Sequence, residues 1–525
     1  MKKGKVYIIG AGPGDPGLIT LKGLKALREA DVIVYDSLVN EEIIRFRDYD
    51  PLTSAGDTGQ GEGPPGKKPA KLIYAGKHGG SHTLPQEEIN SLLVAEAAKG
   101  QVVARLKGGD PFIFGRGGEE AEVLTRRGIP FEVIPGVTSA IAAPAYAGIP
   151  LTHRNFTSTV AFVTGQENPA KGKSNIDWPA LACIGTVIFY MGVKNLAHIV
   201  SSLVAAGKDE STPAALIRRG TLPEQETLVG NLGDIVRKAR EKGIRPPAIF
   251  VVGQVVTLRD ELNWFENNPL FGKGVVITRP RAQAGGFASL LQAAGARVIH
   301  FPTIEIIPPA SFADQDRAID ELDSFHWIIF TSANGVRFFF QRLKERGRDI
   351  RDLKGIKICA VGPATAALIE ARGIKVDLVP KSYLSEGIAA AFQGMDMSGK
   401  KILLPRAELA RDVVPAALSG LGAQVAPIVV YRTVSTAGKR AEIAGHIDEG
   451  KVDVITFTSP STVKGFLEIW GEDKPLPKGI RIACLGSVTG AAARKAGFRV
   501  DIMQDVFTIE ALVEGMAACF AGDRA

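Results

Sequence analysis

The chain has 525 residues, 45% hydrophobic and 23% charged, which is typical of a soluble globular protein with three or four domains of roughly 150 residues each. The net charge is only +7, without a block of basic residues or an aromatic-basic array, which disfavours nucleic acid as a partner and suits an acidic small molecule. No apolar run reaches the roughly 20 residues that would span a bilayer, so we predict a cytoplasmic protein with no membrane partner. The cysteines Cys183, Cys359, Cys484 and Cys519 have no metal-ligand spacing, which predicts reduced thiols and no metal site.

The first elements are strands that end in polar or glycine-rich turns. Residues 6–20, VYIIGAGPGDPGLIT, predict a strand and a glycine turn, but Pro13 lacks a backbone N–H that a pyrophosphate would need, so dinucleotide binding is disfavoured. The alternating run DVIVYD over 31–36 predicts a second strand with Asp36 at its carboxyl end. The Gly- and Pro-rich stretch 56–68 has no apolar periodicity and predicts a surface loop.

The most particular segment is VARLKGGDPFIFGRGGEE, residues 103–120. An apolar strand over 102–106 precedes Gly108 and Gly109, which let a ligand approach the backbone because neither has a Cβ. Asp110 then offers a carboxylate at the edge where open α/β sheets bind ligands. A tight structural turn is the alternative interpretation of this segment.

Together with its neighbours, this segment resembles the uroporphyrinogen-III C-methyltransferases of the tetrapyrrole methylase family. The similar segments are GAGPGDPGLIT, DVIVYDSLV, GKHGGSHTLPQEEIN, RLKGGDPFIFGRGGEE, IPGVTSAIAAPAYAGIPLTHR and YMG, within residues 4–265. The resemblance implies two α/β subdomains with S-adenosylmethionine in the cleft between them, and a homodimer formed through this half. It also implies two successive methyl transfers to carbons of uroporphyrinogen III, which give precorrin-2.

The resemblance also implies which residues contact the methyl donor. They are Pro13, Gly108, Gly109, Asp110, Ile113, Thr138, Ser139, Met191 and Gly220. A sulfonium donor needs carbonyls, an apolar wall and a carboxylate rather than a phosphate cradle, and these residue types agree with that need. Met191 is equally compatible with a plain core position.

Two residues are candidates for proton transfer. The resemblance makes Asp36 the candidate general base and Lys77 the candidate acid. Methylating a pyrrole carbon leaves a proton to be lost or an imine-like centre to be stabilised, so an acid–base pair is chemically reasonable. In the alternative, Asp36 only orders a loop and Lys77 holds a substrate carboxylate.

The substrate is a polycarboxylate, so basic residues are expected to line its site. Arg116, His153 and Arg154 are the candidates, and each is also compatible with a solvated surface charge. Where the family often has Thr-Gly-His, this chain has Gln166 after Thr164 and Gly165, so a titrating histidine is absent there.

A polar stretch over 266–273 predicts a linker between a domain of 1–265 and one of 274–525. In the second half Pro280-Arg281-Ala282 recurs as Pro405-Arg406-Ala407, and Phe330-Thr331-Ser332 recurs as Phe457-Thr458-Ser459. The offset is nearly constant at about 125 residues, which predicts two copies of one α/β unit rather than a short-period solenoid. Short β-rich runs alternate with Ala-rich helical stretches, which favours parallel sheets flanked by helices.

This half resembles uroporphyrinogen-III synthase in VVITRPRAQ, WIIFTSANGV, ICAVGPATA, ILLPRAE, VVYRTV and VITFTSPSTV, taken in order. The resemblance implies two lobes with a two-stranded connection, one of about 274–304 with 435–520 and the other of about 306–432. It implies a cofactor-free cyclisation of hydroxymethylbilane with loss of water, in which the protein mainly holds a flexible polyacid in a productive conformation.

Tyr431 resembles the tyrosine implicated in that family and is a candidate proton donor to the leaving hydroxyl, with structural packing as the alternative. Candidates for binding substrate carboxylates follow predicted strands in the two copies; they are Arg281, Thr331, Ser332, Arg406, Thr458 and Ser459. The hydroxyl residues are equally suited to cap the following helices, and the arginines to pair with local acids.

The two resemblances predict a bifunctional enzyme that makes consecutive steps toward sirohaem and cobalamin. One alternative is a methyltransferase whose second half binds tetrapyrrole without catalysis, and another makes that half a small-molecule sensor or scaffold.

Overall fold

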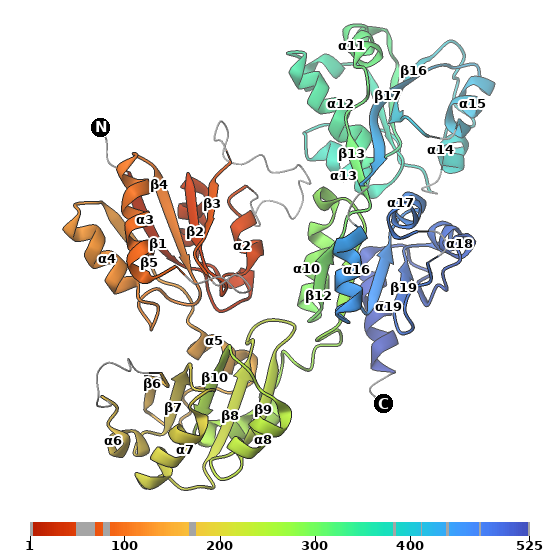
Figure 1. The fold of residues 1–525 in the computed structure, drawn as a ribbon. Coiled ribbons are helices and arrows are strands. Elements are labelled where there is room, and N and C mark those ends of the chain that lie inside the picture. Colours follow the sequence, from red (N-terminus) through yellow and green to blue (C-terminus); the bar gives the residue numbers. More distant parts are fainter. Residues whose placement is uncertain are drawn as a thin grey trace.

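The computed structural model describes residues 4–48, 69–76, 84–166, 175–381, 385–410, 412–436, 440–471 and 474–522. Within these segments the chain forms four five-stranded sheets, each flanked by helices (Figure 1). None of the helices in the described part is long and apolar enough to cross a membrane.

The first sheet is entirely parallel, in the order β3-β2-β4-β1-β5. Its strands are β1 (Lys5–Gly10), β2 (Val32–Tyr35), β3 (Lys71–Tyr74), β4 (Val102–Lys107) and β5 (Phe131–Ile134). Because side chains alternate along a strand, Ile9 and Leu106 meet helices α1 (Leu21–Glu29) and α2 (Glu41–Arg45) on one face. On the other face Ile8 and Val103 meet α3 (Gln86–Ala98) and α4 (Gly117–Arg126). The parallel order brings the carboxyl ends of all five strands to one edge.

The second sheet is mixed, in the order β6-β7-β10-β8-β9, and only β6 and β7 run parallel. Its strands are β6 (Val160–Thr164), β7 (Thr186–Tyr190), β8 (Pro213–Arg218), β9 (Glu226–Asn231) and β10 (Ala248–Val252). Helix α5 (Ser139–Tyr146) packs on one face. Helices α6 (Trp178–Ala182), α7 (Leu196–Ala205) and α8 (Ile235–Lys242) cover the other, and α9 (Arg259–Leu262) follows β10.

The third sheet, in what we call lobe one, is parallel in the order β12-β11-β18-β19-β20. Its strands are β11 (Gly274–Ile277), β12 (Arg297–His300), β18 (Val454–Phe457), β19 (Arg481–Cys484) and β20 (Ile502–Met503). Helices α10 (Gly285–Ala293) and α19 (Ile509–Ala521) cover one face. Helices α16 (Arg440–Asp448), α17 (Pro460–Trp470) and α18 (Ser487–Lys495) cover the other.

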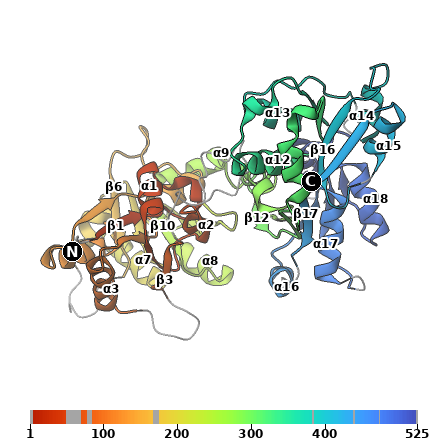
Figure 2. The same ribbon diagram turned by 90° about the horizontal axis from the view of Figure 1, so that it is seen from above.

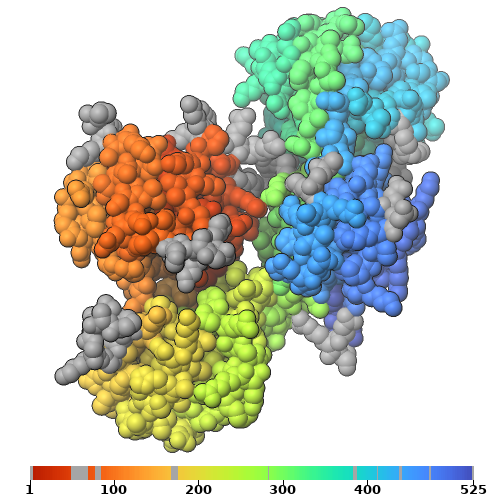
Figure 3. All heavy atoms as spheres, viewed as in Figure 1, coloured from red at the N-terminus to blue at the C-terminus, as the bar shows by residue number. Residues whose placement is uncertain are grey.

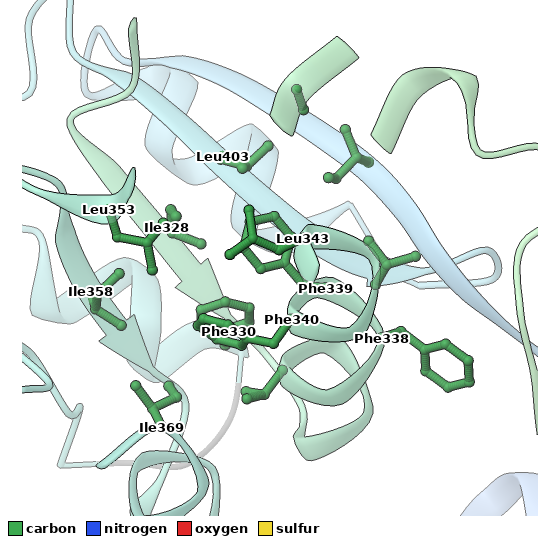
Figure 4. Packing of buried hydrophobic residues seen from close by; sticks show 14 of the residues in the cluster. Ile328, Phe330, Phe338, Phe339, Phe340, Leu343, Leu353, Ile358, Ile369 and Leu403 are labelled. Atoms are coloured by element: carbon green, nitrogen blue, oxygen red, sulfur yellow. The ribbon is translucent and has the colours of Figure 1, made fainter. Parts of the chain in front are cut away.

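The fourth sheet, in lobe two, has the order β13-β17-β16-β14-β15. Its strands are β13 (Ile304–Ile307), β14 (Trp327–Phe330), β15 (Lys357–Ala360), β16 (Lys401–Ala407) and β17 (Gln424–Ser435). Its helices are α11 (Ala313–Asp320), α12 (Ala333–Glu345), α13 (Pro363–Glu370), α14 (Ser385–Ala391) and α15 (Val413–Gly420). Phe330 of β14 packs against Phe339 and Phe340 of α12 in the core (Figure 4).

Strand β17 pairs with two strands: its first part runs parallel to β16, and its second part runs antiparallel to β13. β13 and β17 are therefore the paired strands that connect the two lobes.

The duplication read from the sequence is visible in the strand order. The run β12-β11-β18-β19 of lobe one corresponds to β17-β16-β14-β15 of lobe two. The repeated Phe-Thr-Ser segments end β18 and β14, which occupy the same place in the two orders. The predicted α/β fold with duplicated lobes is confirmed.

The N-terminal and C-terminal halves lie side by side (Figure 2), and the second sheet's domain touches lobe one (Figure 3). Glu224, just before β9, forms an ion pair with Arg297 of lobe one, and the side chain of Glu42 of α2 lies near Gln292 of α10. Between the halves, Glu266 accepts hydrogen bonds from Gln225 and Thr227, whereas Leu270 is fully buried in the core of lobe one.

Candidate functional site

The carboxyl ends of β1, β4 and β5 meet in a tight glycine contact. Gly12 and Gly109 exchange backbone hydrogen bonds of 3.2 and 2.7 Å. A Cβ on Gly10 would lie 2.5 Å from the Gly136 Cα, and one on Gly136 would overlap the Gly109 carbonyl oxygen. Only glycine fits at these positions, so the turns that follow three strands are held together at one edge of the sheet.

The second subdomain reaches this edge through two loops. The Tyr190 hydroxyl lies 2.6 Å from the Thr138 hydroxyl, and its ring lies 5.0 Å from that of Phe114. The Asp15 backbone N–H donates to the Thr221 hydroxyl at 3.0 Å. The structure therefore brings together the segments that carry the predicted methyl-donor residues: 12–15, 108–114, 138–139, 190–191 and 220–221.

Backbone strain concentrates in these segments. The residues other than glycine that have positive φ in the described chain are Phe114, Arg116, Met191, Arg219 and Thr221, with φ between 48° and 72°. L-residues adopt this conformation at a cost, and such outliers cluster at ligand sites, where the surrounding structure over-determines them. The cluster identifies this meeting point of the two subdomains as the leading candidate site of the N-terminal half.

Several residues that are predicted to contact the methyl donor also make close contacts within the protein. The Asp110 carboxylate accepts hydrogen bonds from the backbone N–H groups of Phe112, Ile113 and Gly136 at 2.8, 3.1 and 3.0 Å. A Cβ on Gly108 would lie 2.6 Å from the Leu38 Cβ, and one on Gly220 would overlap Ala143. The tight-turn interpretation of residues 108–113 therefore agrees with the contacts that these residues make in the structure.

The apolar members of the predicted set are exposed. Ile113 is 38% exposed and Met191 48% exposed, so Met191 is not a core residue. Pro13 and Ser139 are half-buried, and Thr138 is buried against Tyr190. The arrangement offers an apolar wall beside backbone carbonyl groups, as a sulfonium ligand requires.

The candidate base Asp36 follows β2 at the same edge. Its carboxylate accepts a hydrogen bond from the Leu38 backbone N–H at 3.0 Å, and Nη2 of Arg105 lies 3.5 Å from the other oxygen. The side chain remains 25% exposed. Lys77 and the loop 56–68 lie outside the described residues.

The candidate carboxylate binders of this half make contacts other than those of Asp36 and Arg105. Arg116 donates two hydrogen bonds to Glu119 at 2.9 and 2.7 Å, which raises the pKa of Arg116. The ring of His153 accepts from the Asn155 backbone N–H at 3.3 Å, and Arg154 is exposed. Gln166 shares hydrogen bonds with Thr164 in a local turn.

In the C-terminal half the two lobes meet beside Tyr431. This tyrosine is only 8% exposed, its ring stacks on Phe338, and its hydroxyl lies 3.1 Å from that of Ser332. Two residues after Ser332, Asn334 accepts a hydrogen bond of 2.9 Å from Gln283 of lobe one. The candidate tyrosine therefore lies next to a direct contact between the lobes.

The hydroxyl candidates partly serve the helices that follow them. Ser332 caps α12 by accepting from the Gly335 N–H at 3.0 Å, and Ser459 caps α17 by accepting from the Thr462 N–H at 3.3 Å. Thr331 and Thr458 follow their strands half-buried, with no side-chain role assigned by a contact that the described residues show.

The two equivalent arginines differ. Arg406 pairs with Asp412 at 2.6 Å, as its structural alternative predicts. Arg281 lies on a short 3-10 turn after β11. Partial burial of its side chain, and next the charge of the nearby Arg45, lower the pKa of Arg281. Burial and these two arginines also lower the pKa of His300 to about 4.

Comparison with known proteins assigns both halves. The model of the tetrapyrrole (corrin/porphyrin) methylases matches residues 5–236, and that of uroporphyrinogen-III synthase HemD matches residues 286–514. The porphyrin biosynthesis protein HemD of Ruminiclostridium josui is 36% identical over 524 residues, covering 100% of this chain and 99% of its own. The chain belongs to the family in which a tetrapyrrole methylase is fused to a uroporphyrinogen-III synthase.

Relatives of the methylase half alone are closer in sequence. The uroporphyrinogen-III C-methyltransferase of Priestia megaterium is 50% identical over 254 residues, covering 48% of this chain and 98% of its own. The S-adenosyl-L-methionine-dependent uroporphyrinogen III methyltransferase of Methanosarcina barkeri is 49% identical over 260 residues, covering 49% and 94%. The protein is thus a bifunctional enzyme of tetrapyrrole biosynthesis.

The methylase half also contains a buried charge network that sequence reasoning missed. Arg105 and Lys107 of β4 are 3% and 4% exposed, and Glu120 of α4 is completely buried. Glu120 Oε1 accepts from Arg105 Nε at 3.1 Å, Lys107 Nζ at 2.8 Å and Gln86 Nε2 at 3.2 Å. Burial, and next the charge of Arg105, lower the pKa of Lys107. Two cations in alternate positions of a central strand were the signal for such a network.

The glycine turn of the methylase half has polar anchors that were not singled out either. Asp15 accepts from the Tyr146 hydroxyl at 2.7 Å and from the Gly17 N–H at 2.8 Å, and burial raises the pKa of Tyr146. Asn40 donates to the Gly14 carbonyl at 2.8 Å. These bonds tie the turn after β1 to α5 and to the start of α2.

Proposed function

We propose that the synthase half closes hydroxymethylbilane to uroporphyrinogen III and that the methylase half then methylates this product twice, giving precorrin-2 for sirohaem or cobalamin. The observation that carries the proposal is the meeting of five distant segments at one strained, glycine-rich junction of the two subdomains. The relatives that match this half are named as uroporphyrinogen-III methyltransferases, which gives the substrate class.

The methyl donor is S-adenosylmethionine, which supplies an electrophilic methyl group on a sulfonium centre. The exposed side chains of Ile113 and Met191 suit its apolar parts, and the Asp110 loop and Thr138 offer polar groups beside them. Pro13, Gly108, Gly109, Ser139 and Gly220 complete the proposed contacts from the turns held at the same edge.

Asp36 is proposed to remove the proton that the methylated pyrrole carbon must lose. Its side chain is 25% exposed, which leaves the carboxylate accessible, and the Arg105 guanidinium 3.5 Å away helps to orient it. Lys77 remains the predicted acid, and Arg116, His153 and Arg154 remain the predicted partners of substrate carboxylates.

In the synthase half, Tyr431 is proposed to donate its phenolic proton to the hydroxyl that leaves hydroxymethylbilane as water. The neighbouring Ser332 hydroxyl holds the phenol in position, and stacking on Phe338 fixes its ring. Arg281, Thr331, Arg406, Thr458 and Ser459 are proposed to bind substrate carboxylates at the facing ends of the lobes, so that the open chain is held for closure at its substituted end.

We also propose that the chain is a homodimer through its methylase half. Leu38, Phe112 and Phe156 are large apolar side chains left at least 42% exposed on that half. Light scattering of the purified chain at several concentrations tests the proposal, and a monomer at all concentrations would contradict it.

One assay tests both reactions. The purified chain is given hydroxymethylbilane with and without S-adenosylmethionine, and the oxidised products are resolved by isomer and mass. We expect the type III isomer alone, converted to the dimethylated species when the donor is added. Type I product would favour the alternative of a second half that binds tetrapyrrole without catalysis, and supplied uroporphyrinogen III would then test the methylase half by itself.

A further inference from the structure

The buried network beneath the candidate site of the methylase half is built around one guanidinium. Arg105 donates through Nε to Glu120 at 3.1 Å and through Nη1 to the Leu106 carbonyl at 3.0 Å, while Nη2 lies 3.5 Å from Asp36. Three atoms of a rigid planar fork are thus directed to three fixed partners. A lysine could not satisfy them together, because its ammonium is a single point charge.

Glu120 is the member that orients this fork. It has no exposed surface, and one of its oxygens accepts from Arg105, Lys107 and Gln86. Its position is set by α4, where it lies in the first turn after the Gly117-Gly118 start, while Arg105 and Lys107 come from the central strand β4. The network therefore joins the start of α4 and the end of β4 to Asp36, which follows β2.

The charges of the network balance. Arg105 and Lys107 supply two positive charges, and Glu120 and Asp36 supply two negative charges, all within contact distances of 3.5 Å or less. A buried ion pair is costly to break, because the remaining partner is left uncompensated. Without the Glu120 carboxylate, the Arg105 guanidinium would lose the partner that fixes its Nε. It could then rotate, and its present orientation toward Asp36 would be lost.

We propose that Glu120 is a positioning residue for methyl transfer, acting through Arg105 to hold the Asp36 carboxylate in its reactive orientation. The inference rests on the proposed role of Asp36 as the base. It gives a chemical reason for the charged residues of the segments RLK and GGEE, which the methyl-donor contacts leave unexplained. Lys107 is a charge-balancing partner in this scheme and does not touch Asp36 through a contact that the described residues show.

A matched control exists on the same sheet. Glu96 of α3 is also buried, at 3% exposed, and accepts from Lys71 at 2.8 Å and Lys99 at 3.1 Å. It lies at the end of α3, beside the start of β3, and so at the opposite edge of the parallel sheet from Asp36. Glu96→Gln removes a buried carboxylate from two lysines without touching Arg105.

The test measures methylation of supplied uroporphyrinogen III with S-adenosylmethionine in the full chain. We expect Glu120→Gln and Arg105→Lys to lower kcat by roughly tenfold to a hundredfold with little change in KM, because a displacement of about 1 Å can cost about a hundredfold. Glu96→Gln should lose thermal stability but keep its kcat. An unchanged kcat in either Glu120→Gln or Arg105→Lys would overturn the proposal.

A double variant separates positioning from charge balance and remains informative if Glu120→Gln fails to fold. Lys107→Met combined with Glu120→Gln restores balance, because Arg105 and Asp36 are left as one pair. We expect this variant to recover thermal stability while its kcat stays low. Recovery of kcat as well would show that Glu120 only neutralises Lys107, and the proposal would fail.

Asp36→Asn, measured alongside, distinguishes this inference from the function it rests on. We expect it to lose methylation at least as severely as Glu120→Gln. If Asp36→Asn is fully active, the proposed base is wrong, and the positioning role falls with it. If Asp36→Asn is inactive but Glu120→Gln is not, only the positioning role is wrong.

Discussion

At the residue level, Tyr431, the proposed proton donor of the synthase half, is buried between two neighbours. Tyr431 lies against Phe338 and Ser332, next to the Gln283–Asn334 contact between the lobes. The ring makes the contact with Phe338, whereas the hydroxyl makes the contact with Ser332. The hydroxyl and the ring can therefore be tested separately.

We predict that Tyr431→Phe slows the closure of hydroxymethylbilane by about a hundredfold or more, since a positioned general acid typically contributes about 10²–10⁴ in rate. Loss of the bond to Ser332 should cost only about 1 kcal/mol of unfolding free energy. The measurement is single-turnover cyclisation together with thermal unfolding. Tyr7→Phe, which loses a bond to Glu29 in the methylase half, is the matched control and should leave cyclisation intact. A wild-type rate for Tyr431→Phe would assign Tyr431 to packing.

The cysteines should differ sharply in reactivity. Burial raises the pKa of Cys359 to about 12 and that of Cys484 to about 11, whereas Cys183 is exposed. Because the thiolate is the reactive form, iodoacetamide at about pH 8 should label Cys183 first in the native protein and leave the two buried thiols unmodified. Mass spectrometry of the labelled peptides checks the order. Labelling of Cys359 as fast as Cys183 would contradict the burial described above.

At the scale of elements, the candidate site of the methylase half depends on how closely three strand ends approach one another. The turns after β1, β4 and β5 meet through Gly10, Gly109 and Gly136. A Cβ on Gly10 or Gly136 would collide with backbone atoms that cannot move independently, whereas Gly109 favours glycine through its positive φ of 70°. The first turn of α4 is different, because no atom lies within 4 Å of a Cβ built on Gly118. The two kinds of glycine in this half should therefore respond oppositely to the same substitution.

We predict that Gly136→Ala lowers the unfolding free energy by about 1–3 kcal/mol, the usual cost of overpacking, and weakens S-adenosylmethionine binding by displacing the Gly109 turn. Gly118→Ala should leave stability unchanged or raise it by up to about 1 kcal/mol, because alanine is favoured over glycine in a helix. Chemical denaturation and calorimetric titration measure the two quantities. Equal stability of the two variants would show that the strand ends can separate without cost.

At the scale of the whole molecule, the two halves meet through charged groups. Glu224 pairs with Arg297, Glu42 contacts Gln292, and Arg45 of the methylase half acts on Arg281 and His300 of lobe one. His300 ends β12 in a place where burial and positive charge both oppose its protonation. Lowering the pH below 6.5 should therefore destabilise this junction.

The pKa of His300, about 4 in the folded protein, lies below its ordinary value of 6.5. Between pH 6.5 and about 4, His300 binds a proton in the unfolded chain but not in the folded chain. Its contribution to stability is therefore complete above pH 6.5 and is lost as the pH falls toward 4. The loss is on the order of 3 kcal/mol. We predict that His300→Gln flattens the decline of unfolding free energy between these two pH values. His198→Gln, at an exposed position of α7, should keep the decline of the wild type, and the same slope in both variants would refute the assignment.

The fold class, the duplication and the family could be predicted from the sequence, because short motifs such as GGDPFIFGRGGEE and the repeated Phe-Thr-Ser carry backbone requirements that are local in the chain. The segments predicted to contact the methyl donor lie close together in the structure, and their contacts with the donor stay a prediction.

The partners of individual charged and hydroxyl groups could not be predicted from the sequence and are known from the folded structure alone. Ser332 and Ser459 cap helices, Arg406 pairs with Asp412, and Asp110 is held by three backbone N–H groups. In the network of Arg105, Lys107 and Glu120, the two cations at alternate positions of β4 were a signal of buried charge, but their partner was not. Glu120 lies on a different element, and a charge pattern does not reveal which distant side chain a buried cation will meet. Contacts between distant elements are set by packing, and packing is not a local property of the sequence.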